Sequence, residues 1–181
     1  DITVVSNAVR PPMGIEGKEH ITVSQKLYYN PNPNLSVLVY GSSFFMNTYD
    51  LIQDMTFSQA RDWTAGTKVT YHVKDWFSVT GSLHADFYDR FKRHERIDKR
   101  QKDYESSIYQ PRLTVTSNYF NGHSLILGME HTSDELTSDR FSGNANHDLK
   151  TRALKETEYF LQDEWTINPR WMISAGIRTN F

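Results

Sequence analysis

Apolar and polar residues alternate along most of this chain with the period of two that is typical of a β-strand. Between Phe77 and Phe87 every odd-numbered position carries an apolar residue or glycine, and every even-numbered position carries a polar one. The same pattern runs, with interruptions, through four other stretches: Leu35–Tyr49, Phe57–Val73, Tyr109–Tyr119 and Trp171–Asn180. It predicts an all-β chain of about eight or nine antiparallel strands, each with one apolar and one polar face.

Turns of two lengths separate these strands. Short turns are predicted near residues 32, 74, 121 and 169, where Asn121-Gly122 is a strong hairpin signal and Pro169 has the fixed φ angle that favours a tight turn. The connections near residues 10, 52, 98 and 144 are predicted to be longer, and they are polar. Short turns at one end and long loops at the other are typical of an up-and-down outer-membrane β-barrel.

Some stretches fit the strand pattern less well. Lys92–Asp103 is almost wholly charged, so it is either a solvated loop or the polar extension of two strands. Asp50–Met55 is predicted to form a loop, and His131–Lys150 a polar region. Pro111 lacks the backbone N–H that a β-ladder needs, which counts against a central strand at that position.

Large apolar residues recur ten positions apart on the apolar face, as in Leu35 and Phe45 or Phe77 and Phe87. At roughly 3.3 Å per residue and a tilt of about 40°, ten residues climb about 25 Å, the height of the lipid-facing band of a membrane barrel. Two aromatic girdles are predicted, with Tyr29, Tyr71, Phe77, Tyr119, Trp165 and Trp171 beside the short turns. The alternative is a soluble β-sandwich, whose strands are typically about five or six residues long.

The composition narrows the possible classes of protein. Hydrophobic residues make up 38% of the chain and aromatic residues 13%, with a mean hydropathy of −0.63, which suits strands that are apolar on one face only. No apolar run reaches the roughly 18 residues of a membrane helix. The net charge of −2 supplies no basic field for a nucleic acid partner, and the absence of cysteine excludes disulfides and thiolate metal sites.

The end of the chain carries a more specific pattern. Tyr159-Phe160-x-Gln162-Asp163-Glu164-Trp165, followed by a short turn, Trp171 and Gly176-x-Arg178, resembles a barrel hairpin of the TonB-dependent outer-membrane receptors. The resemblance implies that residues 1–181 are part of one transmembrane β-barrel domain in the bacterial outer membrane, with the plug domain and the remaining strands outside this sequence. The matching residues are structural positions, so they imply no catalytic or ligand-binding role.

The resemblance also implies a function. Receptors of this family actively take up a scarce nutrient, typically a ferric siderophore, haem, cobalamin or a glycan, and the inner-membrane TonB complex supplies the energy through the plug. The expected partners are therefore the TonB complex, a small nutrient ligand and the lipid bilayer, with no nucleic acid. No cofactor and no enzymatic activity are expected.

Candidate catalytic groups are few. No phosphate loop, dinucleotide fingerprint, HExxH or GxSxG motif occurs, so we assign no catalytic residue and no metal site, and cofactor-binding residues stay undefined. His84 with Asp86, and His131 with Asp134 and Glu135, are the groups that a barrel hydrolase could use. Residues two apart share one face of a strand, so His84 and Asp86 meet the minimum geometry for acid–base cooperation. The simpler interpretation is that they line a wet lumen.

Polar stretches hold candidates for ligand binding. His94 and His147 are potential ligands of haem iron if the substrate is haem, and the charged run Lys92–Lys102 is suited to an anionic ligand such as a ferric chelate. Oxygen donors that calcium prefers also occur, but without EF-hand spacing, so an acidic loop is the default interpretation. These donors are Asp134, Glu135, Asp139, Asn144, Asn146 and Asp148.

Charged residues on the polar face are expected to remain hydrated inside the barrel. In a large receptor such residues form ion pairs and hydrogen bonds with a plug domain. We expect plug contact, more than ligand contact, for most of Lys68, Asp86, Arg112, Glu130 and Arg178.

The alternative to a receptor segment is a complete small eight-stranded outer-membrane barrel that acts as an adhesin, a structural protein or a surface hydrolase. Closing such a barrel requires an even number of strands and compatible terminal edges. The pattern contains nine partial strands and stops inside a strand at Phe181. We therefore expect a segment of a larger barrel.

Overall fold

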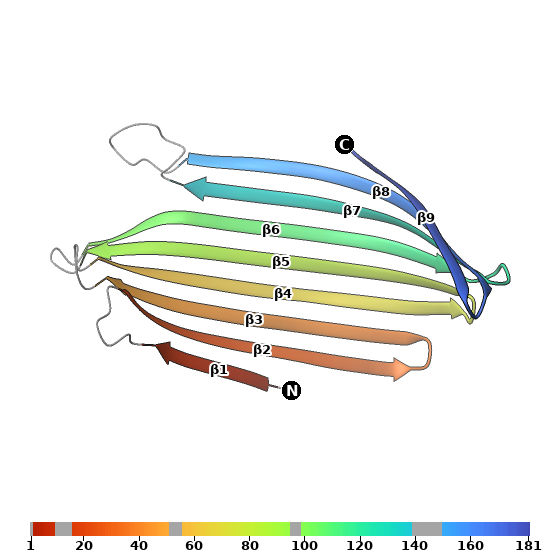
Figure 1. Cartoon of the computed structure of the whole chain (residues 1–181), viewed down its shortest axis with the longest axis horizontal. Coiled ribbons are helices and arrows are strands. Elements are labelled where there is room, and N and C mark those ends of the chain that lie inside the picture. Colours follow the sequence, from red (N-terminus) through yellow and green to blue (C-terminus); the bar gives the residue numbers. More distant parts are fainter. Residues whose placement is uncertain (1, 10–15, 51–55, 95–98, 139–149) are drawn as a thin grey trace.

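The computed structural model describes residues 2–9, 16–50, 56–94, 99–138 and 150–181. These residues form nine strands: β1 (Ile2–Val9), β2 (Glu16–Asn32), β3 (Leu35–Asp50), β4 (Thr56–Lys74), β5 (Phe77–His94), β6 (Lys99–Ser117), β7 (His123–Ser138), β8 (Lys150–Asn168) and β9 (Trp171–Asn180). The strands lie side by side in chain order in one antiparallel sheet, with β1 and β9 at its edges (Figure 1). Within the described residues no helix is long and apolar enough to cross a membrane. The predicted all-β, antiparallel up-and-down architecture is confirmed.

The strands are longer than the ten residues that cross the apolar band. From β2 to β8 they contain 16 to 19 residues each. The described part of Lys92–Asp103 is the polar extension of two strands, because β5 continues to His94 and β6 begins at Lys99. Asp50 ends β3, so it is not in a loop, and the rest of that predicted loop lies outside the described residues. The four residues between β5 and β6 lie outside the described part of the chain, so most of this charged run belongs to the two strands.

One face of the sheet, which we call the lipid face, exposes large apolar side chains. Trp63 is 49% exposed and Leu83 45%, although both lie in the middle of long strands. Other exposed members of this face include Leu27, Val39, Val69, Tyr71, Phe87, Tyr109, Leu113, Leu127, Leu161, Trp165, Ile173 and Ile177. Across the described part of the chain, Ala60 is the only buried hydrophobic residue. A soluble sandwich would bury such a face in a core, so the sheet is organised as a barrel wall.

Aromatic residues gather at both ends of the apolar band. Beside the short turns, the rings of Trp76 and Tyr119 are 5.0 Å apart between centroids, and His123 stacks on Trp165 at 5.3 Å. The predicted girdle at this end therefore exists, extended by Trp76. Aromatic side chains of this kind mark the membrane interface in outer-membrane barrels.

A second aromatic level lies toward the opposite ends of the strands. Phe45 meets Trp63 edge-on at 5.2 Å, and Phe87 meets Tyr109 edge-on at 5.4 Å.

At the second aromatic level the lipid face becomes charged, since Arg61 pairs in register with Phe45. Arg61 pairs in register with Asp89, and Asp89 with Glu105, while the Lys102 ammonium lies 2.7 Å from Asp89 and 2.8 Å from Glu105. Charged groups at this level belong in water, so the apolar band ends here. The ends of the strands that follow are extracellular, since outer-membrane barrels place short turns on the periplasmic side.

Local chemistry explains the short turns. The side-chain oxygens of Asn32 and Asn168, each followed by proline, accept hydrogen bonds from the backbone N–H of Asn34 (3.0 Å) and Arg170 (2.9 Å). Such bonds close a turn without help from the rest of the sheet. Gly122 has a φ angle of +77°, which L-residues with a side chain rarely adopt, so the Asn-Gly signal marks a real hairpin.

Pro111 lies in the central strand β6, so the expectation drawn from its missing N–H is wrong. On the β5 side it pairs with Leu83 without a break. On the β7 side the register runs from Tyr109 opposite Ser133 to Arg112 opposite Glu130, with no pair at residues 110 and 111. The cost of proline is therefore confined to one short gap in one ladder.

Candidate functional site

Polar side chains share the opposite face of the sheet, which we call the lumen face. One register row shows the arrangement: Lys68 pairs with Ser82, Ser82 with Arg112, and Arg112 with Glu130. The five charged residues that the sequence placed on the polar face do share it: Lys68, Asp86, Arg112, Glu130 and Arg178. The lumen face is therefore the part of the sheet that can meet a polar solute.

Near the middle of the lumen face, Tyr40 reaches across a whole strand. Tyr40 of β3 pairs with Gly66 of β4, which in turn pairs with His84 of β5. The hydroxyl oxygen of Tyr40 lies 3.0 Å from Nδ1 of His84. A Cβ atom at Gly66 would lie 2.3 Å from the Tyr40 ring, so the ring can lie over β4 only because residue 66 is glycine.

His84 and Asp86 lie on the same face, as their spacing predicts, but they are bonded to different partners. Oδ2 of Asp86 accepts a hydrogen bond of 2.9 Å from the Thr64 hydroxyl, while His84 bonds to Tyr40. An acid–base pair requires the carboxylate to orient the imidazole toward a reacting group. The geometry of these two residues therefore supports lumen lining and gives no support to hydrolysis.

A hollow of about 240 Å³ lies farther along the lumen face, beside Phe160. The Phe160 ring covers Gly128, where an added Cβ would lie 2.1 Å from the ring. The guanidinium carbon of Arg112 is 4.7 Å from the centre of the same ring. This distance is that of a cation–π contact, which holds the guanidinium against the wall.

Two ion pairs border this hollow. Arg112 lies 3.6 Å from Glu130, and Arg178 contacts Glu158. The two arginine side chains are 47% and 60% exposed, whereas the two glutamates are 20% and 19% exposed. The wall therefore presents its guanidinium groups to the lumen and keeps the compensating carboxylates beneath them.

The extracellular end of the lumen face carries a buried ion cluster that sequence reasoning did not identify. Asp103 is 2% exposed, and its carboxylate accepts hydrogen bonds from Arg90 Nε at 3.2 Å and Nη2 at 2.9 Å. The Lys92 ammonium lies 3.1 Å from the same carboxylate. Burial favours the neutral acid, but the hydrogen bonds and charges of Arg90 and Lys92 outweigh burial and lower the pKa of Asp103. The cluster lies beyond the second aromatic level, outside the apolar band.

The alternation of side chains predicts the position of only part of this cluster. Arg90 continues the even-numbered series of His84 and Asp86, so its face was predictable. Asp103 was not predictable, because an extra residue in β6 reverses the alternation between Tyr104 and Lys102. No glycine or proline marks that irregularity in the sequence.

The second predicted hydrolase group is divided by the sheet. His131 and Glu135 lie on the side of the lipid face and Asp134 on the lumen face, since residues an odd number apart point in opposite directions. Nδ1 of His131 lies 2.9 Å from the Thr157 hydroxyl. The interpretation of these three residues as one group is wrong.

The calcium and haem candidates gain no support. Asp134 and Glu135 are on opposite faces, and His94 is the last residue of β5. The other candidates lie outside the described residues: Asp139, Asn144, Asn146, His147 and Asp148. In the part of the chain that the structure describes, no three His, Cys, Asp or Glu side chains are grouped to hold a metal ion.

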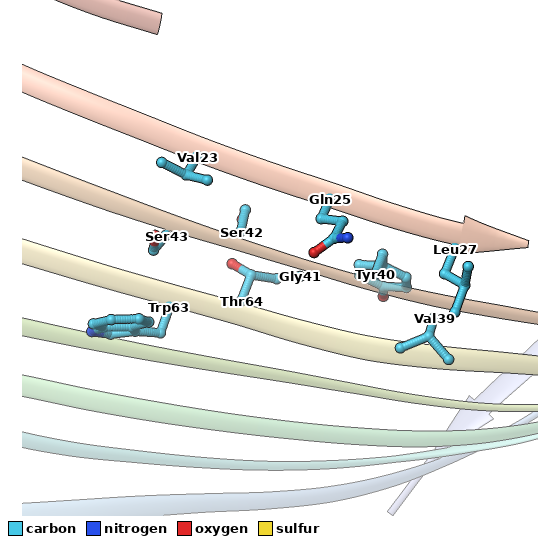
Figure 2. Close-up of a pocket in the computed structure, with 10 residues that line it drawn as sticks. All are labelled: Val23, Gln25, Leu27, Val39, Tyr40, Gly41, Ser42, Ser43, Trp63 and Thr64. Carbon is cyan, nitrogen blue, oxygen red and sulfur yellow. The ribbon is translucent and has the colours of Figure 1, made fainter. Parts of the chain in front are cut away.

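A hollow of about 490 Å³ between β2, β3 and β4 belongs largely to the other face. Figure 2 shows Leu27 and Val39 at one of its ends and Ser43 and Trp63 at the other, with Gly41 between them. These walls are residues of the lipid face, where acyl chains are the expected neighbours. We therefore do not assign this hollow to a polar ligand.

The fold matches solved outer-membrane barrels. The siderophore receptor PiuA from Acinetobacter baumannii superimposes on 99% of this chain with a TM-score of 0.74 and 10% identity. The copper transporter OprC superimposes on 96% of the chain with a TM-score of 0.68 and 14% identity. The toluene transporter TbuX from Ralstonia pickettii covers 92% of the chain at a TM-score of 0.50 and 10% identity.

These similarities concern the fold alone, because the sequences share so little identity. The chain spans 38% of PiuA and 32% of OprC, so it corresponds to about a third of their length. The sequence matches no protein-family model and no curated protein. The fold is that of the wall of an outer-membrane β-barrel, and the predicted location in the outer membrane agrees with it.

Proposed function

We propose that this chain is part of an outer-membrane receptor that takes up a scarce nutrient and is energised by the TonB complex. The observation that carries the proposal is the fold: nearly the whole chain superimposes on the siderophore receptor PiuA, and the same sheet separates an apolar from a polar face. The C-terminal resemblance, Tyr159-Phe160-x-Gln162-Asp163-Glu164-Trp165, points to the same family. The residues of this motif lie on β8, which forms the last hairpin of the sheet with β9.

The lumen face fits a barrel that holds a plug. Arg112 and Arg178 are 47% and 60% exposed on a wall where the Phe160 ring lies over Gly128. A plug packed against this wall would meet exposed guanidinium groups, which form strong bidentate hydrogen bonds with carboxylates. We propose that these two arginines contact acidic groups of the plug.

The described strands do not favour the smaller alternative. They form an open sheet of nine, in which β1 pairs only with β2 and β9 only with β8. A closed bacterial barrel of one chain has an even number of strands and joins its first strand to its last. The separate bonding of His84 and Asp86 also removes the main support for a surface hydrolase.

Uptake by the source bacterium tests the proposal. A strain without the gene, a strain without TonB and the parent strain would be supplied with radiolabelled ferric siderophores, haem and cobalamin under nutrient limitation. The proposal predicts that uptake of one of these compounds is lost in both mutant strains and restored by the gene. Uptake that continues without TonB but stops without the gene would contradict energised transport and favour a passive channel.

A further inference from the structure

A β-bulge in β6 brings Asp103 to the lumen face. Arg90 of β5 pairs with Tyr104 of β6, but the next pair is Phe91 with Lys102, so Asp103 is the extra residue. A bulge redirects the side chains of its strand because the extra residue shifts the alternation. Asp103 therefore lies against Arg90, while its neighbour Lys102 lies on the opposite face.

The bulge orients one guanidinium group. The Asp103 carboxylate accepts hydrogen bonds from Nε and Nη2 of Arg90, along one edge of the guanidinium plane. The Ser138 hydroxyl donates a hydrogen bond of 3.3 Å to the Asp103 backbone carbonyl. Two hydrogen bonds along one edge fix the plane of an arginine more firmly than a single contact does. Together with Lys92 the cluster has two bases and one acid, so its net charge is +1.

Two tyrosines complete an open hollow beside this guanidinium. The rings of Tyr88 and Tyr104 meet edge-on at 5.5 Å and 79°, and the Arg90 guanidinium carbon is 5.6 Å from the Tyr104 ring centre. With Ser106 these three residues line a volume of about 450 Å³ on the lumen face. The hollow therefore combines two aromatic rings, hydroxyl groups and a positive charge.

This combination selects a particular kind of ligand. A guanidinium group recognises a carboxylate or another planar anion, and tyrosine rings at right angles offer a face and an edge to a further aromatic ring. A simple inorganic anion would use the charge but leave the rings unused. An aromatic acid would use both.

We propose that Tyr88, Arg90 and Tyr104 bind an aromatic acid group at the extracellular end of the lumen face, and that Asp103 is the positioning residue that orients Arg90 for this contact. The proposal rests on the proposed function, since it places the first contact of an imported ligand. Asp103 is buried beneath Arg90 and acts through it.

Calorimetric titration of the full-length natural protein in detergent tests this assignment with two probes, benzoate and inorganic phosphate. Phosphate reports charge alone, and benzoate reports charge together with the rings. For Asp103→Asn we expect benzoate to bind about tenfold more weakly, because the guanidinium loses its fixed orientation against Tyr104. Phosphate binding should hold or tighten, because the variant loses a negative charge. Arg90→Gln should weaken both probes, and Lys26→Gln, which removes a cation in register with Tyr40 and outside the cluster, should weaken neither.

A second variant, Tyr104→Leu, keeps the proposal testable if Asp103→Asn does not fold. Tyr104→Leu keeps every charge and removes the ring, so benzoate affinity should fall while phosphate affinity holds. Equal weakening of both probes by either variant, or unchanged benzoate binding in both, would overturn the assignment. If the parent protein does not bind benzoate but the Arg90→Gln variant still imports a nutrient with TonB, the subsite is overturned and the transport proposal stands. If the protein binds benzoate but imports no nutrient, the transport proposal is overturned and the subsite stands.

Discussion

The aromatic ring of Tyr40 lies over the α-carbon of Gly66, and its hydroxyl group thereby reaches His84 two strands away. The contact ties β3, β4 and β5 together on the lumen face without any side chain from β4. It also keeps the tyrosine ring flat against the wall, where it leaves the lumen open. The same relation recurs between Phe160 and Gly128.

Replacing Gly66 by alanine should destabilise the barrel. The new Cβ would lie 2.3 Å from the Tyr40 ring, so the ring must lift and the bond to His84 must break. We expect a loss of about 0.5 to 1.5 kcal/mol in the free energy of unfolding, the usual net contribution of one hydrogen bond, because the clash falls on the far end of the Tyr40 side chain, which can swing into the lumen. Urea unfolding of the natural protein in detergent, followed by tryptophan fluorescence, measures this loss.

Gly81→Ala is the matched control for that measurement. Gly81 is also in a strand, but an added Cβ there would meet nothing within 4 Å. Its stability should change little. Equal destabilisation by the two alanines would show that the Tyr40 contact does not set the effect.

Gly122 should be the most sensitive position of the β6–β7 turn. Its φ angle is +77°, and an added Cβ would lie 2.7 Å from the Thr166 carbonyl oxygen. The backbone N–H of Thr166 also donates a hydrogen bond to the Gly122 carbonyl oxygen. Gly122→Ala should therefore cost about 1 kcal/mol or more in unfolding free energy. Gly122→Asn should share the clash but relieve part of the backbone strain, because asparagine tolerates positive φ. Asparagine destabilising as much as alanine would show that the clash alone decides the effect.

A charge should be tolerated on only one face of the sheet. Leu83→Arg places a guanidinium on the lipid face, where we expect a cost of about 2 to 4 kcal/mol or failure to assemble in the outer membrane. Gln110→Arg places the same group on the lumen face, where it stays hydrated. Heat-modifiable migration of the two variants from purified outer membranes compares them. Normal assembly of Leu83→Arg together with loss of Gln110→Arg would reverse the assignment of the faces.

Asp103 should stabilise the folded protein only when it is ionised. Its pKa is lowered from the ordinary value of 3.8 in the folded state, so its ion pairs contribute fully above that value. The contribution is lost as the pH falls through the lowered pKa, because the acid is then protonated in both states. The stability difference between the parent protein and Asp103→Asn should thus shrink below pH 3.8. A stability difference between the two proteins that stays constant from neutral pH to about pH 2 would contradict an ionised Asp103.

The alternation of side chains predicted the faces of the sheet well, because a period of two is imposed by the strand itself. His84, Asp86 and Arg112 lie on the face that their positions indicated. Pro111 misled the prediction, since one missing N–H affects only one of the two ladders of a central strand. The long polar ends of the strands were ambiguous, because strands beyond the apolar band are solvated on both faces and lose the pattern.

The candidate binding site was harder to predict. Its residues on β5, Tyr88 and Arg90, follow the alternation. The face of its positioning residue, Asp103, depends on a bulge that has no signature in the sequence. The Tyr40 and His84 contact was equally hidden, because it depends on register across three strands. Contacts that arise from register and bulges require the paired strands to be known.

The intact mass of the natural gene product, extracted from the source outer membrane in detergent, tests the central claim most directly. If this chain is one segment of a plug-containing receptor, native mass spectrometry should give a mass several-fold above 21.1 kDa. A mass near 21.1 kDa would contradict the receptor and leave a small barrel.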